Sequence, residues 1–255
     1  MSNQKSVTIS CAVEGLVDEA LVKRLGEHLH APIGHVYGKK GKDYPKQKIE
    51  GFNNAARFKP WIVLIDLDHD YECAPPLIES LLPSQFSNMC FRVAVREAEA
   101  WILADRENLA NFLSIHVSKI PPCPESIPDP KLTIVNLARQ SRKREIQADM
   151  VPRPASGRLV GPAYTSRLIE FIEDQKNGWR PDVASQYSDS LNRCILCINR
   201  LTNNPSQRFY TDKGNSFQDW YFKLLRWTIN RLVGTRIDSK YISQKMPLHP
   251  QKGFF

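Results

Sequence analysis

Three aspartates alternate along one short stretch of the chain: Asp66, Asp68 and Asp70. They follow Trp61-Ile-Val-Leu-Ile65, an apolar run rich in β-branched residues, which predicts a buried strand. Alternate residues of an extended segment point to one side, so these carboxylates are expected to converge where the strand leaves its sheet. Like charges this close repel one another unless a cation neutralises them, and oxygen-only ligands favour Mg²⁺ or Mn²⁺. The alternative is a solvated acidic turn that caps the next helix.

Glu14 is another carboxylate at the end of a predicted strand. Glu14 ends the apolar run 7–13, another predicted strand, and is followed by Gly15, which permits a tight backbone turn. A carboxylate there could exchange a proton with a reacting oxygen. The alternative is a glutamate that only favours a helix N-terminus. Glu14 together with the later Asp-x-Asp is more specific than either feature alone.

The elements that must position these side chains alternate between strand and helix over the first 105 residues or so. The spacing of apolar residues predicts strands at 7–13, 33–37, 61–65 and 91–95, and helices at 17–29, 48–58, 75–82 and 98–113. Strands joined by helical crossovers imply a mainly parallel sheet with helices on both faces. Ligands of such sheets bind at the carboxyl ends of the strands, where Glu14 and Asp66 both lie.

Three regions are expected. Residues 1–113 form the α/β domain with the acidic residues. Residues 114–130 contain five prolines and are interpreted as a stiff linker or a lid. Residues 131–255 form a basic, mainly helical region, with clear helical stripes at 164–172, 191–201 and 217–232.

Charge differs between the two halves. Residues 1–138 hold 15 Lys and Arg against 17 Asp and Glu, whereas residues 139–255 hold 20 against 10. A basic second half suits a polyanion such as DNA or RNA, although arginines that solvate helix faces would give the same balance. Two sets of cations are candidate nucleic-acid contacts, with ordinary solvated surface as the alternative for both. They are Lys39, Lys40 and Lys42 in a glycine-bounded loop, and Arg139, Arg142 and Lys143 on one side of a predicted helix.

Export and membrane insertion are not indicated. No apolar run approaches the ~18 residues of a membrane span, and the polar start of the chain does not have the pattern of a signal peptide. Six scattered cysteines without an export signal are expected to stay reduced. We therefore expect a soluble, cytoplasmic protein.

The order Val13-Glu14-Gly15, Asp18, then Ile62-Val-Leu-Ile-Asp66-Leu-Asp68 resembles the TOPRIM domain of topoisomerases, primases and the overcoming-lysogenisation-defect nucleases. The resemblance implies an α/β fold with a TOPRIM-like, mainly parallel sheet flanked by helices and followed by a helical C-terminal region. It implies that Glu14 is the general acid or base, that Asp66 and Asp68 are metal ligands, and that Asp70 matches a third acidic residue of some TOPRIM proteins. No tyrosine nucleophile can be assigned, which disfavours topoisomerase chemistry.

A further segment, Val95-Arg-Glu-Ala-Glu99-Ala-Trp-Ile-Leu-Ala-Asp105, is similar to the signature of a TOPRIM-related bacterial family of unknown function. That family is associated with anti-phage defence and with ABC- or SMC-like ATPases encoded nearby, and the resemblance covers residues 7–201. Glu97 and Glu99 would lie roughly 200° apart on a helix, so we expect one of them, Glu99, to face the metal. Whether the signature ligates a second metal or holds the fold stays open. Trp101 is interpreted as a core residue.

These observations predict a nuclease, or another effector acting on phosphodiesters, that depends on Mg²⁺ or Mn²⁺ and works beside an ATPase partner. Two alternatives remain. The first is a non-catalytic TOPRIM-like subunit that binds an ATPase or nucleic acid. The second is a small-molecule phosphohydrolase.

Overall fold

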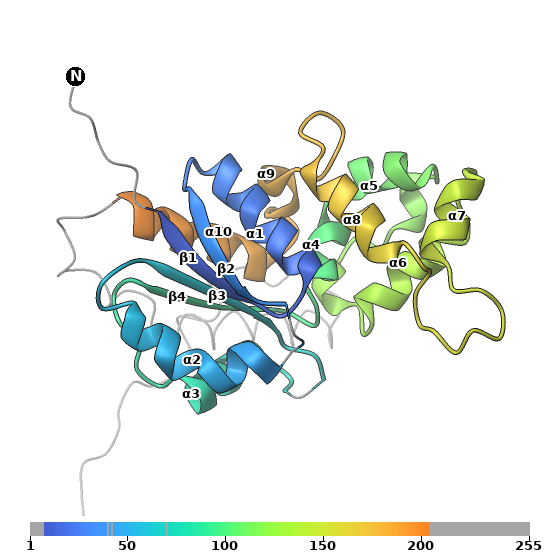
Figure 1. Cartoon of the computed structure of the whole chain (residues 1–255). Helices are drawn as coiled ribbons and strands as arrows, with labels where there is room; N and C mark the ends of the chain where they lie inside the picture. The colour runs from blue at the N-terminus through green and yellow to red at the C-terminus, as the bar shows by residue number, and fades with distance from the viewer. Residues whose placement is uncertain (1–7, 40, 42, 70, 204–255) are drawn as a thin grey trace, which may run out of the picture. The chain divides into compact units, whose positions relative to one another are not determined.

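Four short strands form a sheet in the computed structural model, which describes residues 8–39, 41, 43–69 and 71–203 (Figure 1). They are β1 (Ile9–Val13), β2 (Ile33–Gly38), β3 (Trp61–Asp66) and β4 (Met89–Ala94). All pairings are parallel, in the order β2-β1-β3-β4, with Cys11 opposite both Val36 and Ile62. The parallel sheet that the strand-helix alternation predicted is confirmed.

Side chains alternate between the two faces of the sheet and divide the core in two. In β3, Ile62 and Leu64 pack into one apolar cluster, whereas Trp61, Val63 and Ile65 pack into the other. Helices α2 (Asp43–Ala55) and α3 (Ala74–Leu81) cover the second face, below the sheet in Figure 1. Helices α1 (Leu16–His28) and α10 (Asp189–Asn203) cover the first. Burial on both faces explains why the two central strands, β1 and β3, are almost entirely apolar, whereas the edge strand β2 is not.

The first-face cluster continues into a helical layer. Its elements are α4 (Glu99–Ala104), α5 (Arg106–Leu113), two single turns (Val117–Lys119 and Pro124–Ser126), α6 (Pro130–Ala138), α7 (Arg144–Met150), α8 (Tyr164–Glu173) and α9 (Pro181–Ala184). Helix α4 is buried along its whole length and packs against α6 and α9, while α8 packs against α1. The α/β fold with a helical C-terminal region is therefore as expected for the described residues.

Residues 114–130 are not an extended linker in the structure. Ile120 and Ile127 are buried, and the Glu125 carboxylate accepts hydrogen bonds from the Ser188 hydroxyl and the Ser190 amide at the start of α10. The prolines stiffen a segment that packs on the core. All described residues fall in one compact unit, Met1–Ser206, so the expected boundary at residue 130 does not separate two units. The rest of the predicted basic region, from residue 204, lies outside the described residues.

Two element boundaries differ from the sequence-based expectation. The expected helix 98–113 is divided in two at Asp105, whose ψ of 72° ends α4 and whose carboxylate caps α5. Helix α2 begins at Asp43 rather than near 48. Within the described ranges, none of the helices combines the length and apolar character that crossing a membrane requires.

Candidate functional site

The carboxyl ends of β1 and β3 bring Glu14 and Asp66 together. Ser10, Cys11 and Ala12 of β1 pair with Trp61, Ile62 and Val63 of β3, so the residues that follow the two strands leave the sheet side by side. Glu14 Oε1 accepts a hydrogen bond from the Asp66 backbone N–H at 3.3 Å. This confirms the shared sheet edge that the two strand ends predicted.

Asp18 joins the pair from the first turn of α1. Its Oδ2 accepts the Gly15 backbone N–H at 2.7 Å, which satisfies a donor at the start of the helix. The bond holds the carboxylate beside the β1–α1 turn rather than in solvent, and Asp18 is only 7% exposed. Asp18 therefore lies next to Glu14 although four residues separate them in sequence.

Glu99 and Lys131 complete the arrangement from the helical layer. The Ala98 backbone N–H donates to Asp66 Oδ1 at 2.9 Å, which places the start of α4 against the end of β3. Lys131 Nζ lies 3.5 Å from Glu99 Oε1 and 3.3 Å from Glu97 Oε1. The Lys131 backbone N–H also donates to Glu97, so Glu97 positions the lysine while Glu99 faces the other carboxylates.

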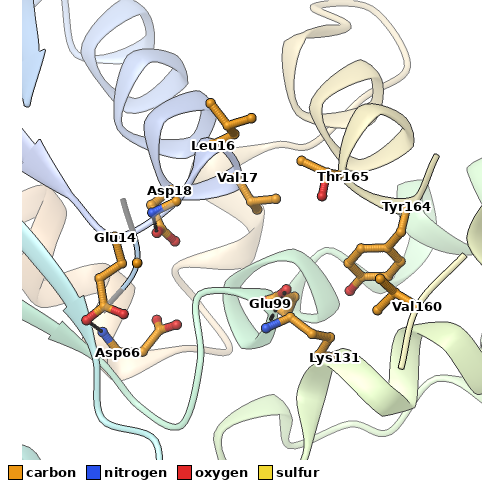
Figure 2. A pocket seen from close by; sticks show the side chains of 12 residues that line it. Glu14, Leu16, Val17, Asp18, Asp66, Glu99, Lys131, Val160, Tyr164 and Thr165 are labelled. Atoms are coloured by element: carbon orange, nitrogen blue, oxygen red, sulfur yellow. Dashed lines mark hydrogen bonds and ion pairs between the residues drawn. The ribbon is translucent and has the colours of Figure 1, made fainter. Parts of the chain in front are cut away.

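One pocket of about 350 Å³ connects these groups (Figure 2). Its lining includes four carboxyl side chains from four different segments, one lysine, and side chains from the starts of α1 and α8. The lining residues are Glu14, Gly15, Leu16, Val17, Asp18, Gly41, Asp66, Glu99, Lys131, Val160, Tyr164 and Thr165.

Burial and mutual repulsion make the charged carboxylates costly. Burial raises the pKa of Glu14 to about 7, although the Asp66 amide and Lys46 oppose the rise. Burial also raises the pKa of Glu99 to about 7, with Lys131 opposing and Glu97 adding to the rise. The pKa of Asp66 is raised well above its ordinary value by burial first, and then by Asp18, Glu99 and Glu14. The pocket therefore concentrates negative charge that the described residues neutralise only in part.

The comparisons with known proteins add no relative. No family model, curated protein or solved structure matches this chain.

The described carboxylates are not a ready-made cage. Among the residues that the structure describes, no group of three or more His, Cys, Asp or Glu side chains is arranged to hold a metal ion. Several of the carboxylates are instead held by backbone N–H groups or by Lys131. A cation in this pocket would take one or two protein carboxylates and complete its shell with other oxygens.

The other two aspartates of the alternating motif have different positions. Asp70 lies outside the described residues. Asp68 has a φ of 53°, so the extended alternation ends at Asp66, and Asp68 is not among the pocket-lining residues. Its backbone N–H donates to the Arg96 carbonyl, and its negative charge contributes to the raised pKa of Glu14. Asp68 therefore lies near the pocket without facing into it.

The predicted nucleic-acid contacts are dispersed. Lys39 forms an ion pair with Glu19 at 3.2 Å, and Lys40 and Lys42 lie outside the described residues. The expectation that Arg139, Arg142 and Lys143 share one helix face is wrong, because α6 ends at Ala138 and α7 begins at Arg144. Arg139 donates to the Asn136 side chain, and the Arg142 backbone N–H donates to the Ser114 carbonyl. Arg139, Arg142 and Lys143 therefore lie in the turn between the two helices and not on a helix face.

The second signature divides into a pocket residue and residues that hold the fold. Glu99 faces the pocket, as expected. Trp101 is fully buried and its Nε1 donates to the Ser190 hydroxyl at 2.7 Å, which confirms it as a core residue. Asp105 is also fully buried and accepts two hydrogen bonds from the Arg180 guanidinium, at 2.6 and 3.0 Å. Trp101 and Asp105 thus tie α4 to residues 180–190.

Sequence reasoning did not assign a site role to Asp18, Lys131, Tyr164 or Thr165. Asp18 had a usable signal, because an acidic side chain three residues after a helix-capping glycine faces the helix start. Lys131 and Tyr164 come from the far side of the supposed linker. No local pattern indicates that these two residues meet Glu99, because only the packing of α6 and α8 brings them there.

Proposed function

We propose that this protein hydrolyses phosphodiester bonds of nucleic acid with Mg²⁺ or Mn²⁺ at the carboxylate pocket. The observation that carries the proposal is the convergence of Glu14, Asp18, Asp66 and Glu99 on one pocket at the carboxyl edge of a parallel sheet. Parallel sheets place their ligands at this edge. Burial is the main cause of the raised pKa of Asp66, and binding of a cation would relieve the repulsion by Asp18, Glu99 and Glu14 that adds to it.

The donor set fits a hard divalent cation. It offers only carboxyl oxygens, the ligands that Mg²⁺ and Mn²⁺ prefer, and the pocket leaves room for water and phosphate. Mg²⁺ typically takes one or two carboxylates and keeps several waters or phosphate oxygens, so a cage of three side chains is not required. Asp66 is the central candidate ligand, with Asp18 and Glu99 beside it. A bound cation would neutralise the scissile phosphate and lower the pKa of a water molecule.

The chain's own groups would supply proton transfer and orientation. A general base works best when its pKa is near the working pH, and the pKa of Glu14 is about 7. Its hydrogen bond from the Asp66 amide fixes the carboxylate beside the candidate ligand. Lys131, whose pKa is raised by Glu99 and Glu97 against the effect of burial, stays charged and would hold a phosphate oxygen.

The resemblance to TOPRIM domains supports the same assignment and extends it. On that resemblance we further propose a role in anti-phage defence beside an ABC- or SMC-like ATPase. The raised pKa values and the pocket do not depend on the resemblance.

The test is cleavage by the purified chain, alone and with any ATPase encoded beside it. Cleavage of labelled DNA or RNA should require Mg²⁺ or Mn²⁺ and should fall ~10²–10⁴-fold in Glu14→Gln, which keeps the side-chain size but cannot take a proton. Glu79→Gln, an exposed substitution on α3, is the matched control and should cleave normally.

Two results would replace the proposal. Wild-type protein that cuts neither DNA nor RNA under any of these conditions would favour a non-catalytic partner subunit. Metal-dependent turnover of a phosphomonoester without cleavage of nucleic acid would favour a small-molecule phosphohydrolase.

A further inference from the structure

The pocket has two unlike sides. The carboxylates of Glu14, Asp18 and Asp66 form one side, and Tyr164, Thr165 and Val160 form the other (Figure 2). Leu16 and Val17, at the start of α1, extend toward the space between them. Leu16, Val17 and Val160 are referred to below as the apolar wall. Metal binding and proton transfer do not require apolar side chains. The apolar wall therefore indicates that the ligand has an apolar part in addition to its charged part.

Leu16 is a large apolar side chain that is 51% exposed at the first position of α1. A single exposed leucine is ordinary on a protein surface. Here it shares one pocket with two half-buried valines, Val17 beside it and Val160 on the opposite side, so apolar side chains lie on both sides of the space next to the acidic groups. A nucleotide has the matching composition, because it joins a flat, largely apolar base to a charged phosphate.

The start of α8 favours a phosphate between the two sides. Both α1 and α8 begin at the pocket, but the Asp18 carboxylate already accepts a backbone N–H at the start of α1, so the first backbone N–H groups of α8 are the ones that attract an anion. The N-cap of α8, Ala163, has no side chain that could satisfy these donors. The Tyr164 hydroxyl, in a residue 2% exposed, points toward Glu99 and Lys131 and makes no hydrogen bond of good geometry within the described part of the chain, although burial and then the nearby Glu99 carboxylate raise its pKa well above the ordinary value. A buried donor of this kind is available to a ligand.

The size of the pocket restricts the form of the nucleic acid. A volume of about 350 Å³ is at the lower end of ligand pockets. Helices α1 and α8 pack directly against each other, and both contribute their first residues to its lining. In a duplex, each base is stacked and paired, so its face is not available to a side chain, whereas a single strand can present an unstacked base.

We propose that the pocket takes one nucleotide of a single-stranded nucleic acid, with its phosphate toward the carboxylates and Lys131 and its base against the apolar wall. This inference rests on the proposed function and adds the form of its substrate. It assigns Leu16, Val160 and Tyr164 to substrate binding, and none of them belongs to the basic sets expected from the sequence.

The test compares the full chain on a labelled 20-mer of DNA, the same RNA sequence, and the duplex of each, at one ionic strength. Fluorescence anisotropy with Ca²⁺, which also takes oxygen ligands, measures binding, and Mg²⁺ is used for cleavage. We expect the single strands to bind at least about tenfold more tightly than the duplexes. Leu16→Ala should weaken single-strand binding about fivefold through lost apolar contact. Leu196→Ala, which changes another exposed leucine (60% against 51% for Leu16) on α10, is the control.

Tyr164→Phe provides a second variant that should fold normally. Removing a buried hydroxyl that makes no hydrogen bond of good geometry should change thermal stability only slightly, whereas it should weaken single-strand binding if the hydroxyl donates to the ligand. Equal affinity for single strands and duplexes, with Leu16→Ala binding like wild type, would overturn the inference even if metal-dependent cleavage were found. Single-strand preference and Leu16 dependence without any cleavage would support the inference and refute the proposed nuclease function.

Discussion

Glu99 couples the pocket to the stability of the whole fold through its protonation. The side chain is 4% exposed, and burial raises its pKa from about 4.5 to about 7, with Lys131 opposing the rise and Glu97 and Asp18 adding to it. The folded protein therefore holds this proton more tightly than the unfolded chain does. The resulting stability is complete below the unfolded pKa and is lost as the pH rises through the folded pKa.

The size of the effect follows from the two pKa values. Between pH 5 and pH 8, deprotonation of this one group should lower the free energy of unfolding by about 2 kcal/mol. Glu99→Gln resembles the protonated form and cannot lose the proton, and Lys131 keeps its ion pair with Glu97. We therefore compare the free energy of unfolding of the variant with that of wild type at each pH. The difference in favour of Glu99→Gln should be about 2 kcal/mol larger at pH 8 than at pH 5.

The measurement is urea unfolding of both proteins with EDTA at pH 5, 6, 7 and 8. Glu50→Gln, exposed on α2, is the matched control and should follow wild type. Added Mg²⁺ should stabilise wild type more at pH 8 than at pH 6, because ligation requires the deprotonated carboxylates. Parallel stability-pH curves for wild type and Glu99→Gln would refute the argument that Glu99 is held protonated by its surroundings.

Two further predictions concern the scaffold. Arg180→Ala should lower the free energy of unfolding by about 3–5 kcal/mol because it leaves Asp105 buried without its charged partner. Arg193→Ala, which breaks an exposed ion pair of the same 2.6 Å length, should lower it by less than about 1 kcal/mol. Similar losses for the two variants in chemical denaturation would contradict this prediction. Gly38→Ala should be far more damaging than Gly41→Ala in the same assay. Both glycines have positive φ, but a Cβ at Gly38 would overlap the Val13 carbonyl oxygen and one at Gly41 meets nothing within 4 Å.

The sequence predicted the sheet well because its signal is local. Strands β1, β3 and β4 are short apolar runs that are mostly buried on both faces, and the helices between the strands have apolar stripes of their own. The strand pattern also predicted that Glu14 and Asp66 lie at the carboxyl edge of the sheet, because parallel strands all end at the same edge. The sequence also predicted the burial of Trp101 correctly.

The remaining features depend on contacts distant in sequence. Asp105 ends α4 because Arg180, 75 residues later, holds its carboxylate, and no local pattern contains that information. Five prolines suggested a linker, but Ile120 and Ile127 are buried in the core. The alternation of Asp66 and Asp68 assumed an extended backbone, which the left-handed conformation at Asp68 ends.

The side chains around Glu99 restrict which segments of this gene could be exchanged by recombination. Glu99 belongs to the first 113 residues, but the lysine that opposes its charge and the tyrosine opposite it come from α6 and α8. The strands and the acidic motif could not be exchanged between genes as a portable module, because the recipient would lack both side chains. Recombination that preserves the pocket must carry its lining residues, from Glu14 to Thr165, together, and variation at position 99 should be accompanied by variation at positions 131 and 164.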